Sequence, residues 1–484
     1  MKYFELENQR LEIKVVDDKE SQVIGFNPEK LICYSLDNKW DIVINSFKDK
    51  CFILSKKDSE EIFNGKKYIE EEDFQVPMES NKAIFEKNIL EEYNINKKPI
   101  TTFILAITYQ CNLRCSYCYQ QHSLKLKRIN MTEQQIESIF QIILEYHQEY
   151  PNEIIQIGLF GGEPLLPSNE NLITKVFEFC KKNLFLVHIT TNGIFLKEYL
   201  KKIIIYRKII NGVNTTVDSM VCNEKTRINM EEEKSEVEES GITILKAVKT
   251  LLYYNIRVNV TTNIDAHNLI EISNIHEFFN KCGFYRYEKF RWDIGRVDDR
   301  LYETNYPDII EETDIILELN KIEFPSSNMH AAFIKTASNL CKKMGMFYGQ
   351  TEIKGTYNYC WTSSGLDKVF YIDNEFNTYR CTYSVGHKEK SIFQFTRENL
   401  IKYKPYNRTY LQNEMCYSCK LGGYCAGGCQ LSFEVDFKRQ CDFEKKSFEK
   451  FVKIVLIPYL KAKMNKEGEE KIEEYKSDEN NFSI

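Results

Sequence analysis

Three cysteines lie close together in the segment Cys111-Asn-Leu-Arg-Cys115-Ser-Tyr-Cys118, directly after the apolar run at residues 102–108. This CX3CX2C spacing indicates an iron–sulfur site, because thiolates are the usual protein ligands of such clusters. A [4Fe–4S] cluster that is ligated only by protein needs four thiolates. Three thiolates on one short loop would leave one iron open to a non-protein ligand, and an open iron is a place for chemistry.

Other roles for these thiols stay open. A zinc loop is one alternative, with His122 close enough in sequence to serve as a ligand. Disulfides are less favoured, because the first residues, MKYFELENQR, contain neither an apolar stretch nor a cleavage site for export. The 16 cysteines of the chain therefore favour metal or redox chemistry in the cytoplasm.

Composition limits the other classes. A chain of 484 residues is too long for one ordinary core and predicts two or three domains. The net charge of −6 provides no basic field that would attract nucleic acid. The apolar stretch at residues 451–460 is interrupted by Lys453 and Pro458 and is too short to span a bilayer. We expect a soluble cytoplasmic protein without nucleic-acid or membrane partners.

The segment from about residue 100 to about residue 300 alternates between strand-like and helix-like patterns. Strands are predicted at 102–108, 154–160, 185–190, 213–217, 257–263 and 289–294. Helices are predicted at 172–182, 195–206, 244–254 and 269–281, and a further helix is predicted to begin at a capping box formed by Thr132 and Gln135. Six successive βα units predict an α/β fold with a parallel sheet and right-handed crossovers.

Polar and glycine-rich residues follow the predicted strands, where barrel enzymes place their chemistry. The segments are Gly161-Gly162-Glu163-Pro164, Thr190-Thr191-Asn192-Gly193, Thr216-Val217-Asp218, and Thr262-Asn263-Ile264-Asp265 with Asn268. Glycines allow close approach of the backbone to a ligand, and the negative charge of Glu163 suits an amino group.

The cysteine loop, with the aromatic Tyr117 before its third cysteine, resembles the CX3CXΦC loop of radical S-adenosylmethionine (SAM) enzymes. The resemblance covers about residues 100–300 and implies an open (β/α)6 partial TIM-like barrel. It also implies that Cys111, Cys115 and Cys118 bind a [4Fe–4S] cluster whose open iron takes SAM.

The same resemblance implies roles for residues at the strand ends. Tyr117 would contribute to the cofactor site. Gly161, Gly162 and Glu163 would hold the amino group of SAM, Asn192 and Thr216 would lie near its ribose, and Arg227 would pair with its carboxylate through a bidentate fork. The chain departs from the family in having Asp218-Ser219 where Asp-Gly is common, and in the acidic run at residues 230–239, which we interpret as a solvated insertion.

A second group of cysteines lies near the C-terminus. The spacing is Cys416-X2-Cys419-X5-Cys425-X3-Cys429, followed by Cys441 and preceded by Cys360 and Cys381. It resembles the SPASM domain, an extension of peptide-modifying radical SAM enzymes that carries two auxiliary [4Fe–4S] clusters. The resemblance implies that Cys360, Cys381 and Cys429 bind the first cluster and that Cys416, Cys419, Cys425 and Cys441 bind the second. A zinc ribbon at Cys416–Cys429 is the alternative.

Two fully ligated auxiliary clusters need eight thiolates, and this region has seven, so one iron of the first cluster would be open. Cys341, in a helical-looking segment at 330–346, could be the eighth ligand or a buried structural thiol. The family's glycine five residues before Cys381 is Phe376 here, so the turn would be built differently. The other cysteines show no metal spacing: Cys33, Cys51, Cys180, Cys222 and Cys282.

Residues 1–95 carry no catalytic motif, with β-like runs at 11–16, 42–44 and 51–53 and a helical stretch at 84–93. In similar enzymes this position often holds a winged-helix-like module that binds a precursor's leader as an added strand. A domain that only packs on the barrel is the alternative. The remaining divisions are expected at 96–305 (barrel), 306–350 (helical linker), 351–450 (auxiliary clusters) and 451–484 (C-terminal helix and charged tail), with residues 466–484 disordered.

The resemblance implies an enzyme that cleaves SAM reductively to a 5′-deoxyadenosyl radical, which abstracts hydrogen from a precursor peptide or protein. The expected product is a crosslink such as a thioether, and the expected electron donor is a flavodoxin or ferredoxin. The alternatives are an anaerobic sulfatase-maturating enzyme that forms formylglycine, disfavoured by the long N-terminal extension, and a non-catalytic metal-binding module. RNA modification is weakened by the lack of a basic face. Asp293 and Arg296 are among too many candidates for an acid or base to be chosen.

Overall fold

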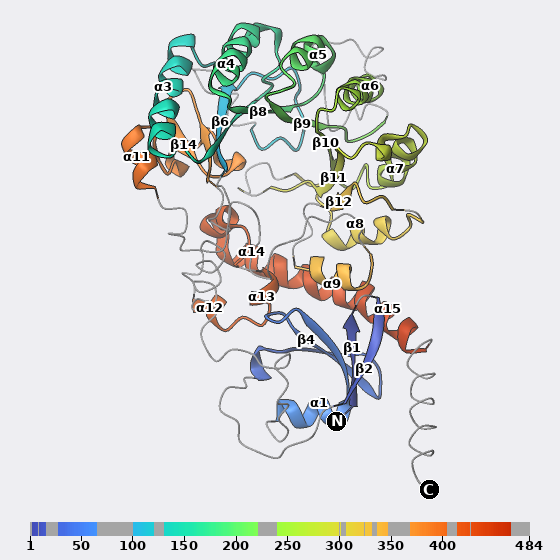
Figure 1. Cartoon of the computed structure of the whole chain (residues 1–484). Coiled ribbons are helices and arrows are strands. Elements are labelled where there is room, and N and C mark those ends of the chain that lie inside the picture. The colour runs from blue at the N-terminus through green and yellow to red at the C-terminus, as the bar shows by residue number, and fades with distance from the viewer. Residues whose placement is uncertain are drawn as a thin grey trace.

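The structure is a computed structural model. It describes residues 2–7, 9–15, 28–64, 100–120, 130–220, 240–299, 301, 306–323, 325–331, 336–346, 368–403, 414–425 and 427–465. Figure 1 shows an α/β barrel at one end, a small β-sheet at the other, and the helix pair α14 and α15 between them.

The barrel is built on the six predicted strands. They are β6 (Ile100–Thr108), β7 (Ile154–Gly161), β8 (Leu186–Thr191), β9 (Ile210–Thr216), β10 (Val258–Ile264) and β11 (Phe290–Arg296). Each pairs in parallel with the next along the chain. The prediction of a partial barrel of six βα units is confirmed.

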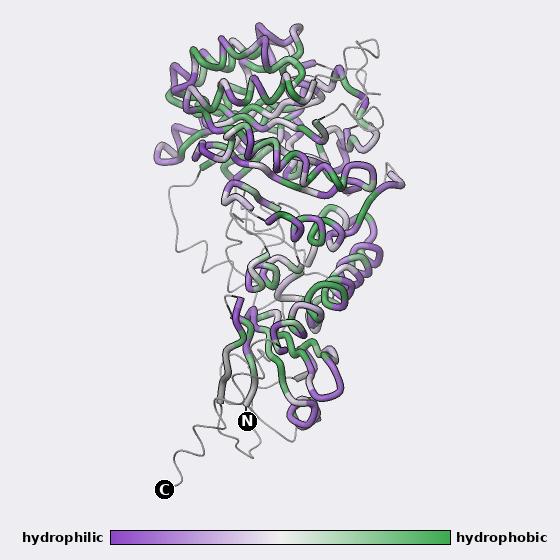
Figure 2. The backbone as a smooth tube through the Cα atoms, turned by 90° about the vertical axis from the view of Figure 1, so that its right-hand side faces the viewer, coloured by the Kyte–Doolittle hydropathy of each residue, from purple (hydrophilic) through white to green (hydrophobic). Residues whose placement is uncertain are grey.

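Helices cover one face of this sheet. They are α3 (Glu133–Glu149), α4 (Glu170–Asn183), α5 (Leu196–Ile205), α6 (Ser240–Tyr253) and α7 (Glu271–Lys281). The predicted capping box is present, because Thr132 accepts a hydrogen bond from Gln135 N and the Gln135 side chain accepts one from Thr132 N. Hydrophobic and hydrophilic residues alternate along these helices (Figure 2), so that each helix buries one side.

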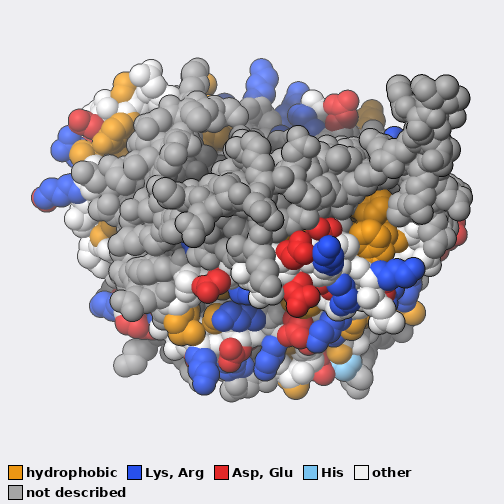
Figure 3. All heavy atoms as spheres, turned by 90° about the horizontal axis from the view of Figure 1, so that it is seen from below, with side chains coloured by type: hydrophobic (Ala, Val, Ile, Leu, Met, Phe, Trp, Pro, Cys, Tyr) orange, Lys and Arg blue, Asp and Glu red, His pale blue; other side chains and the backbone are white. Residues whose placement is uncertain are grey.

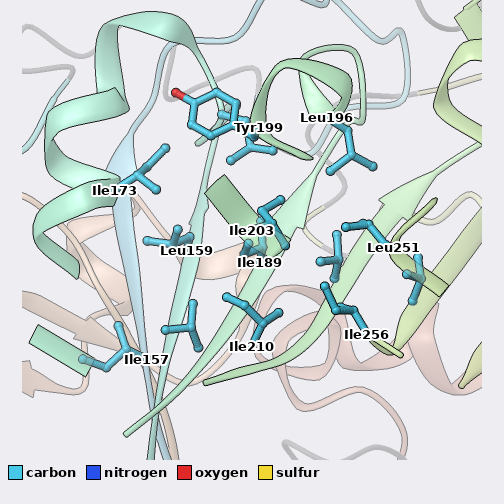
Figure 4. Packing of buried hydrophobic residues seen from close by; sticks show 14 of the residues in the cluster. Ile157, Leu159, Ile173, Ile189, Leu196, Tyr199, Ile203, Ile210, Leu251 and Ile256 are labelled. Atoms are coloured by element: carbon cyan, nitrogen blue, oxygen red, sulfur yellow. The ribbon is translucent and has the colours of Figure 1, made fainter. Parts of the chain in front are cut away.

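The core lies between the strands and these helices. On β8, Val187 and Ile189 are buried in it, since alternate residues of a strand face the same side. Figure 4 shows Ile189 of β8 next to Ile203 of α5 in this core, with Leu159 and Ile157 of β7 to one side. The opposite face of the sheet, the inner face of the barrel, has a separate apolar cluster on β6 and β7 that includes Ala106 and Phe160, and it carries polar side chains on β10 and β11.

The sheet extends beyond the six units on both sides. β12 (Met329–Ala331) pairs in parallel with β11, and β13 (Lys368–Ile372) pairs in parallel with β6. β14 (Asn377–Tyr379) and β15 (Phe393–Gln394) complete a ten-stranded sheet in the order β12-β11-β10-β9-β8-β7-β6-β13-β14-β15. Thus the segments expected to be a linker and an auxiliary-cluster domain both contribute strands to the barrel sheet.

The helical pattern at 330–346 is only partly confirmed. Helix α8 (Glu312–Leu319) precedes this segment. The first residues of the segment belong to strand β12, where Met329 and His330 lie opposite Trp292 and Asp293 of β11. Helix α9 is limited to Ser338–Lys343. Pairing with the edge of β11 gives the backbone groups of β12 the hydrogen-bond partners that a helix would otherwise provide. This pairing outweighs the helical pattern of the local sequence.

The N-terminal domain is a five-stranded antiparallel sheet in the order β2-β1-β5-β4-β3. Its strands are β1 (Lys2–Glu7), β2 (Arg10–Val15), β3 (Ile32–Ser35), β4 (Trp40–Asn45) and β5 (Lys50–Ser55), and helix α1 (Lys56–Phe63) follows. The three predicted runs correspond to β2, β4 and β5, whereas β1 and β3 were not predicted. The helix expected at 84–93 lies outside the described residues.

The C-terminal part is helical. It contains α11 (Arg397–Lys402), α12 (Glu414–Tyr417), α13 (Gly422–Cys425) and α14 (Gln430–Phe451), which continues through a π-helical turn (Val452–Leu456) into α15 (Ile457–Lys463). Short 3-10 turns elsewhere cover Pro28–Lys30, Pro167–Asn169, Phe284–Arg286, Thr382–Ser384 and Lys388–Lys390. A second core, which includes Leu6, Ile53, Leu340, Phe448 and Leu456, joins this helix to the N-terminal sheet.

Seen from the N-terminal sheet's end of the molecule, the described surface intersperses basic and acidic side chains (Figure 3). Among the described helices, none has both the length and the apolar character needed to cross a membrane.

Candidate functional site

The cysteine loop begins where β6 ends. The Thr108 hydroxyl accepts a hydrogen bond from Gln110 N (3.0 Å) and turns the chain toward Cys111. The sulfur of Cys111 accepts one from Leu113 N (3.3 Å), and Cys118 N donates to the carbonyl of Cys115 (3.1 Å). Burial raises the pKa of the Cys111 thiol to about 11. A bound cation would reverse that preference, because a coordinating thiol is deprotonated outright.

The end of β7 packs closely against this loop. Gly162 N donates to Thr108 O (2.9 Å), and Glu163 N donates to Gln110 O (2.8 Å). A Cβ on Gly161, which has a φ of 142°, would stand 2.0 Å from Thr108 O, and one on Gly162 would stand 2.2 Å from Gln110 O. Only glycine permits this approach. The sequence predicted that these glycines allow a ligand to approach the backbone, and in the structure they allow the backbone of Thr108 and Gln110 to approach.

Glu163 connects the ends of β7 and β8. Its side chain is fully buried, and its carboxylate accepts hydrogen bonds from Leu165 N (2.8 Å), the Thr191 hydroxyl (2.7 Å) and Asn192 N (2.6 Å). These hydrogen bonds hold the carboxylate in place between the two strand ends. The role of Glu163 toward an amino group stays a prediction.

Asn192, at the end of β8, reaches the cysteine loop. Its side-chain nitrogen donates to Asn112 Oδ1 (2.8 Å) and lies 3.7 Å from Cys111 Sγ. The side-chain nitrogen of Asn112 is buried and has no hydrogen-bond partner among the described residues. A buried donor without a partner is costly, so this atom favours a ligand against the loop.

Tyr117 connects the same loop to β9 and β10. Its hydroxyl donates to the carboxylate of Asp218, whose other oxygen accepts from Asn263 N (2.7 Å). The side chain of Asn268 donates to Asp218 O (3.0 Å), and the ring of Tyr306 meets Tyr117 edge-on at 6.4 Å. Asp218 and Tyr306 were not predicted as site residues. The position of Asp218 directly after a strand was the available signal, but Tyr306 had none.

Two further residues were predicted to contact SAM, Thr216 and Arg227. Thr216 is the last residue of β9, half-buried, and lies two residues before Asp218. Arg227 lies outside the described residues, as does the acidic run at 230–239. The four strand ends β7 to β10 thus meet around one loop, as predicted, while the contact expected of Arg227 stays a prediction.

The inner face of the barrel carries a polar cluster on β10 to β12. Asp293 accepts hydrogen bonds from the Asn259 side chain (2.6 Å) and from Arg291 Nε (2.6 Å), and His330 lies opposite it in register. Burial lowers the pKa of His330 to about 4, helped by Arg291. Asn259 Oδ1 and His330 Nδ1 have no hydrogen-bond partner among the described residues. This face can therefore accept further hydrogen bonds.

The second group of cysteines gathers around the start of α14. Cys419 N donates to the carbonyl of Cys416 (3.3 Å), and a kink at Asp436 divides α14 between Cys429 and Cys441. Burial, together with the neighbouring thiols of Cys419 and Cys441, raises the pKa of Cys416 to about 11. Cys425 also lies within electrostatic reach of these three thiols. The structure thus brings together the four cysteines assigned to one cluster, and their ligation stays a prediction.

Cys381 lies apart from Cys416, Cys419, Cys425 and Cys441, because the residue after it contacts the loop of Cys111, Cys115 and Cys118. The Tyr119 hydroxyl, one residue after Cys118, shares a hydrogen bond with the Thr382 hydroxyl (2.8 Å). The rings of Tyr119 and Tyr383 are 4.3 Å apart. Cys360, the proposed partner of Cys381, lies outside the described residues.

The turn before Cys381 contains Phe376 where the family has a glycine. Phe376 adopts a φ of 62°, the left-handed conformation that favours glycine. The Asp373 carboxylate holds this turn by accepting hydrogen bonds from Glu375 N (2.8 Å) and Asn377 N (2.9 Å). These side-chain bonds compensate for the strained backbone of a bulky residue.

Cys341 is fully buried in α9 and belongs to the second core with Leu6 and Phe448. Cys419 and Cys425 pack against this core, whereas Tyr119 packs against a separate one. Within the described ranges, no group of three or more His, Cys, Asp or Glu side chains is arranged to hold a single metal ion.

Comparisons with known proteins bear on the barrel. The sequence model of the radical SAM superfamily matches residues 105–281. A GTP 3′,8-cyclase of Aquifex aeolicus is 28% identical over 233 residues, which are 47% of this chain and 66% of that protein. The uncharacterized protein MJ0907 of Methanocaldococcus jannaschii is 25% identical over 230 residues, 47% of this chain and 73% of that protein. The chain therefore spans about two thirds of the length of these relatives.

Solved structures extend the likeness in fold. The enzyme anSMEcpe with bound AdoMet superimposes with a TM-score of 0.54 at 16% identity, covering 76% of this chain and 96% of that one. Its complex with AdoMet and the Cp18Cys peptide gives a TM-score of 0.52 at 16% identity, covering 76% and 99%. The superfamily implies a [4Fe–4S] cluster and SAM, and three cysteines on one loop that also carries a buried donor without a partner among the described residues fit such groups. Residues 105–281 therefore form a domain of the radical SAM superfamily.

Proposed function

We propose that this chain is a radical SAM enzyme that modifies a peptide or protein. The observation that carries the proposal is the convergence of the ends of β7, β8, β9 and β10 on the loop of Cys111, Cys115 and Cys118. These three thiols would hold the [4Fe–4S] cluster, with SAM at its open iron. Together the cluster and SAM supply a carbon-centred radical that abstracts hydrogen from an unactivated carbon of the substrate.

The residues of the chain orient that chemistry. The backbone of Gly161 and Gly162 and the negative charge of Glu163 suit an amino group, and Asn192 and Thr216 lie at the adjoining strand ends. Tyr117 is fixed by its hydrogen bond to Asp218, so its ring is held against the site. We assign the carboxylate of SAM to Arg227, whose bidentate guanidinium suits it.

The C-terminal cysteines support a SPASM-type extension with two auxiliary [4Fe–4S] clusters. Cys416, Cys419, Cys425 and Cys441 would bind one of them. Cys360, Cys381 and Cys429 would bind the other, with one iron open to a substrate thiolate. The position of Cys341 in the second core, beside Cys419 and Cys425 rather than beside Tyr119, supports its role as a structural thiol.

A peptide substrate is supported by two features. The inner face of the barrel offers hydrogen-bonding groups at Asn259 and His330, which suit the amides of an extended peptide. A structure of similar fold was solved with AdoMet and a peptide. We propose a thioether or similar crosslink in a ribosomally made peptide, with a flavodoxin or ferredoxin as electron donor. Location in the cytoplasm stays a prediction from the sequence.

The first test is the release of 5′-deoxyadenosine by reduced, iron-reconstituted protein in the absence of oxygen. We expect release by the wild type and none by Cys115→Ala. Cys282→Ala is the matched control, because Cys282 is half-buried at the end of α7, away from both cysteine groups, and should leave release intact. A wild-type protein that binds iron but releases no 5′-deoxyadenosine would favour the non-catalytic module.

Sulfatase maturation is the second candidate, because anSMEcpe shares the fold. Mass spectrometry of a cysteine-containing precursor peptide after reaction separates the two. A product lighter by two hydrogens, one from the carbon and one from the thiol, indicates a crosslink, whereas an aldehyde indicates formylglycine formation.

A further inference from the structure

The N-terminal sheet forms hydrogen bonds with the loop between Cys419 and Cys425. The turn between β4 and β5 includes Asn45, Ser46 and Phe47, all of them buried. The Ser46 hydroxyl donates to the carbonyl of Lys420 (2.7 Å) and accepts from Gly423 N (3.2 Å). Both partners lie between Cys419 and Cys425 in the sequence.

The contact is close enough to require a glycine. A Cβ on Gly423 would stand 2.1 Å from the carbonyl oxygen of Ser46, a separation that real side chains do not reach. The next residue, Tyr424, donates its hydroxyl to Asp49 at the other end of the same turn (2.9 Å). Three residues of this loop, Lys420, Gly423 and Tyr424, therefore contact one turn of the N-terminal sheet, and Ser46 and Lys420 are 374 positions apart in the sequence.

The loop between Cys419 and Cys425 would have to keep its shape to bind the second auxiliary iron–sulfur cluster. Cys416, Cys419 and Cys425 lie within electrostatic reach of one another and of Cys441. The loop between Cys419 and Cys425 contains two glycines, Gly422 and Gly423, and so has few side chains of its own to hold it in place. Contacts from the N-terminal sheet supply that order.

We propose that Ser46 is a positioning residue for the second auxiliary iron–sulfur centre, and that the N-terminal sheet is a structural part of that centre. The inference rests on the proposed function for the identity of the centre. The sheet thereby has a role at the cysteines, whether or not it also binds a substrate peptide. Any change at the sheet that moves the β4–β5 turn is transmitted to Cys419 and Cys425.

The test uses the full chain with Ser46→Ala and Gly423→Ala. Ser59→Ala is the matched control, because Ser59 is another buried serine of the same domain and its hydroxyl contacts Cys33 instead (3.6 Å). The first readout is alkylation of each cysteine in iron-free protein by N-ethylmaleimide, followed by mass spectrometry. The second is iron content and the Mössbauer spectrum of reconstituted protein.

We expect Cys419 and Cys425 to be alkylated about tenfold faster in Ser46→Ala than in the wild type, because the loop opens more often once two hydrogen bonds are lost. Labelling of Cys180, buried in the barrel core, should not change. Reconstituted Ser46→Ala should lose about four irons per chain, the content of one cluster, while keeping the cluster at Cys111. Gly423→Ala should give the same pattern more strongly, and Ser59→Ala should match the wild type.

Labelling and iron content in Ser46→Ala equal to those of Ser59→Ala would overturn the inference. Equal loss of iron from the two cysteine groups would also overturn it, because it would indicate general unfolding. A wild type that holds only the cluster at Cys111 would overturn it by removing the auxiliary centre. None of these readouts depends on SAM cleavage, so failure of the proposed activity is separately detected by the absence of 5′-deoxyadenosine.

Discussion

Replacing Gly161 with alanine tests whether the contact between the end of β7 and the cysteine loop holds the site together. The new Cβ would stand 2.0 Å from Thr108 O, whereas real Cβ contacts are essentially never shorter than 3.0 Å. The two backbones must therefore separate by roughly 1 Å. The hydrogen bonds from Gly162 N to Thr108 O (2.9 Å) and from Glu163 N to Gln110 O (2.8 Å) would then be stretched beyond useful range.

The expected cost follows from these two losses and from the backbone. Each hydrogen bond contributes about 0.5–1.5 kcal/mol. A φ of 142° at Gly161 is strained for alanine by about 1–3 kcal/mol. Together the change should destabilise the contact between strand and loop by about 2–6 kcal/mol.

The assay combines urea unfolding with iron content and 5′-deoxyadenosine release after reconstitution. Gly161→Ala should lower the unfolding midpoint and reduce both bound iron and release. The control is Gly212→Ala on β9, where the nearest atom to a new Cβ, in the His188 ring, is 3.4 Å away. If Gly161→Ala retains the midpoint, iron and release of Gly212→Ala, the glycine does not position the loop and the reasoning is wrong.

Three further predictions concern the barrel. Thr132→Ala should lower the free energy of unfolding by about 1 kcal/mol, measured by urea denaturation, because it removes one half of the capping box of α3. Lys368→Met should cost about 3 kcal/mol by the same measurement, because it leaves the buried Glu153 without its cation, and the added change Glu153→Gln should recover part of the loss. Burial lowers the pKa of His188 to about 4 from 6.5, so the unfolded chain takes up a proton first as the pH falls. The contribution of His188 to the free energy of unfolding should therefore be fully retained above about pH 6.5 and fall by up to about 1.4 kcal/mol per pH unit toward pH 4. His330, whose pKa is lowered in the same way, should give a similar fall, so the slope of the unfolding midpoints should be smaller in His188→Gln than in the wild type.

Much of the barrel could be predicted from sequence because its signals are local. The capping box of α3 spans only the four residues from Thr132 to Gln135, and each strand and helix between residues 100 and 300 carries its own periodicity. The cysteine spacing is local as well, and so is the placement of Glu163 and Asn192 directly after strands. Each of these features needs only neighbours in the chain.

Other parts could not be predicted, because their structure depends on distant partners. β12 forms at a helical-looking segment since β11 offers an unpaired edge, and β13 joins β6 more than 260 residues after that strand begins. Phe376 takes a glycine's conformation because Asp373 holds the turn around it. No pattern at residues 306–311 pointed to Tyr306, which reaches the site only through the folding of the segment after β11.

The sequence by itself determined which reactive groups this chain carries: three thiols at one spacing, seven more near the C-terminus, and polar residues after four of the strands. Only the tertiary structure decided how those groups meet. It brought Gly161 and Gly162 into contact with the cysteine loop and Tyr117 into a hydrogen bond with Asp218. It also joined Ser46 by hydrogen bonds to the segment between Cys419 and Cys425. The physical reason is that spacing encodes which ligands share a loop, whereas contacts between segments hundreds of residues apart are set by packing and hydrogen bonding in the folded chain.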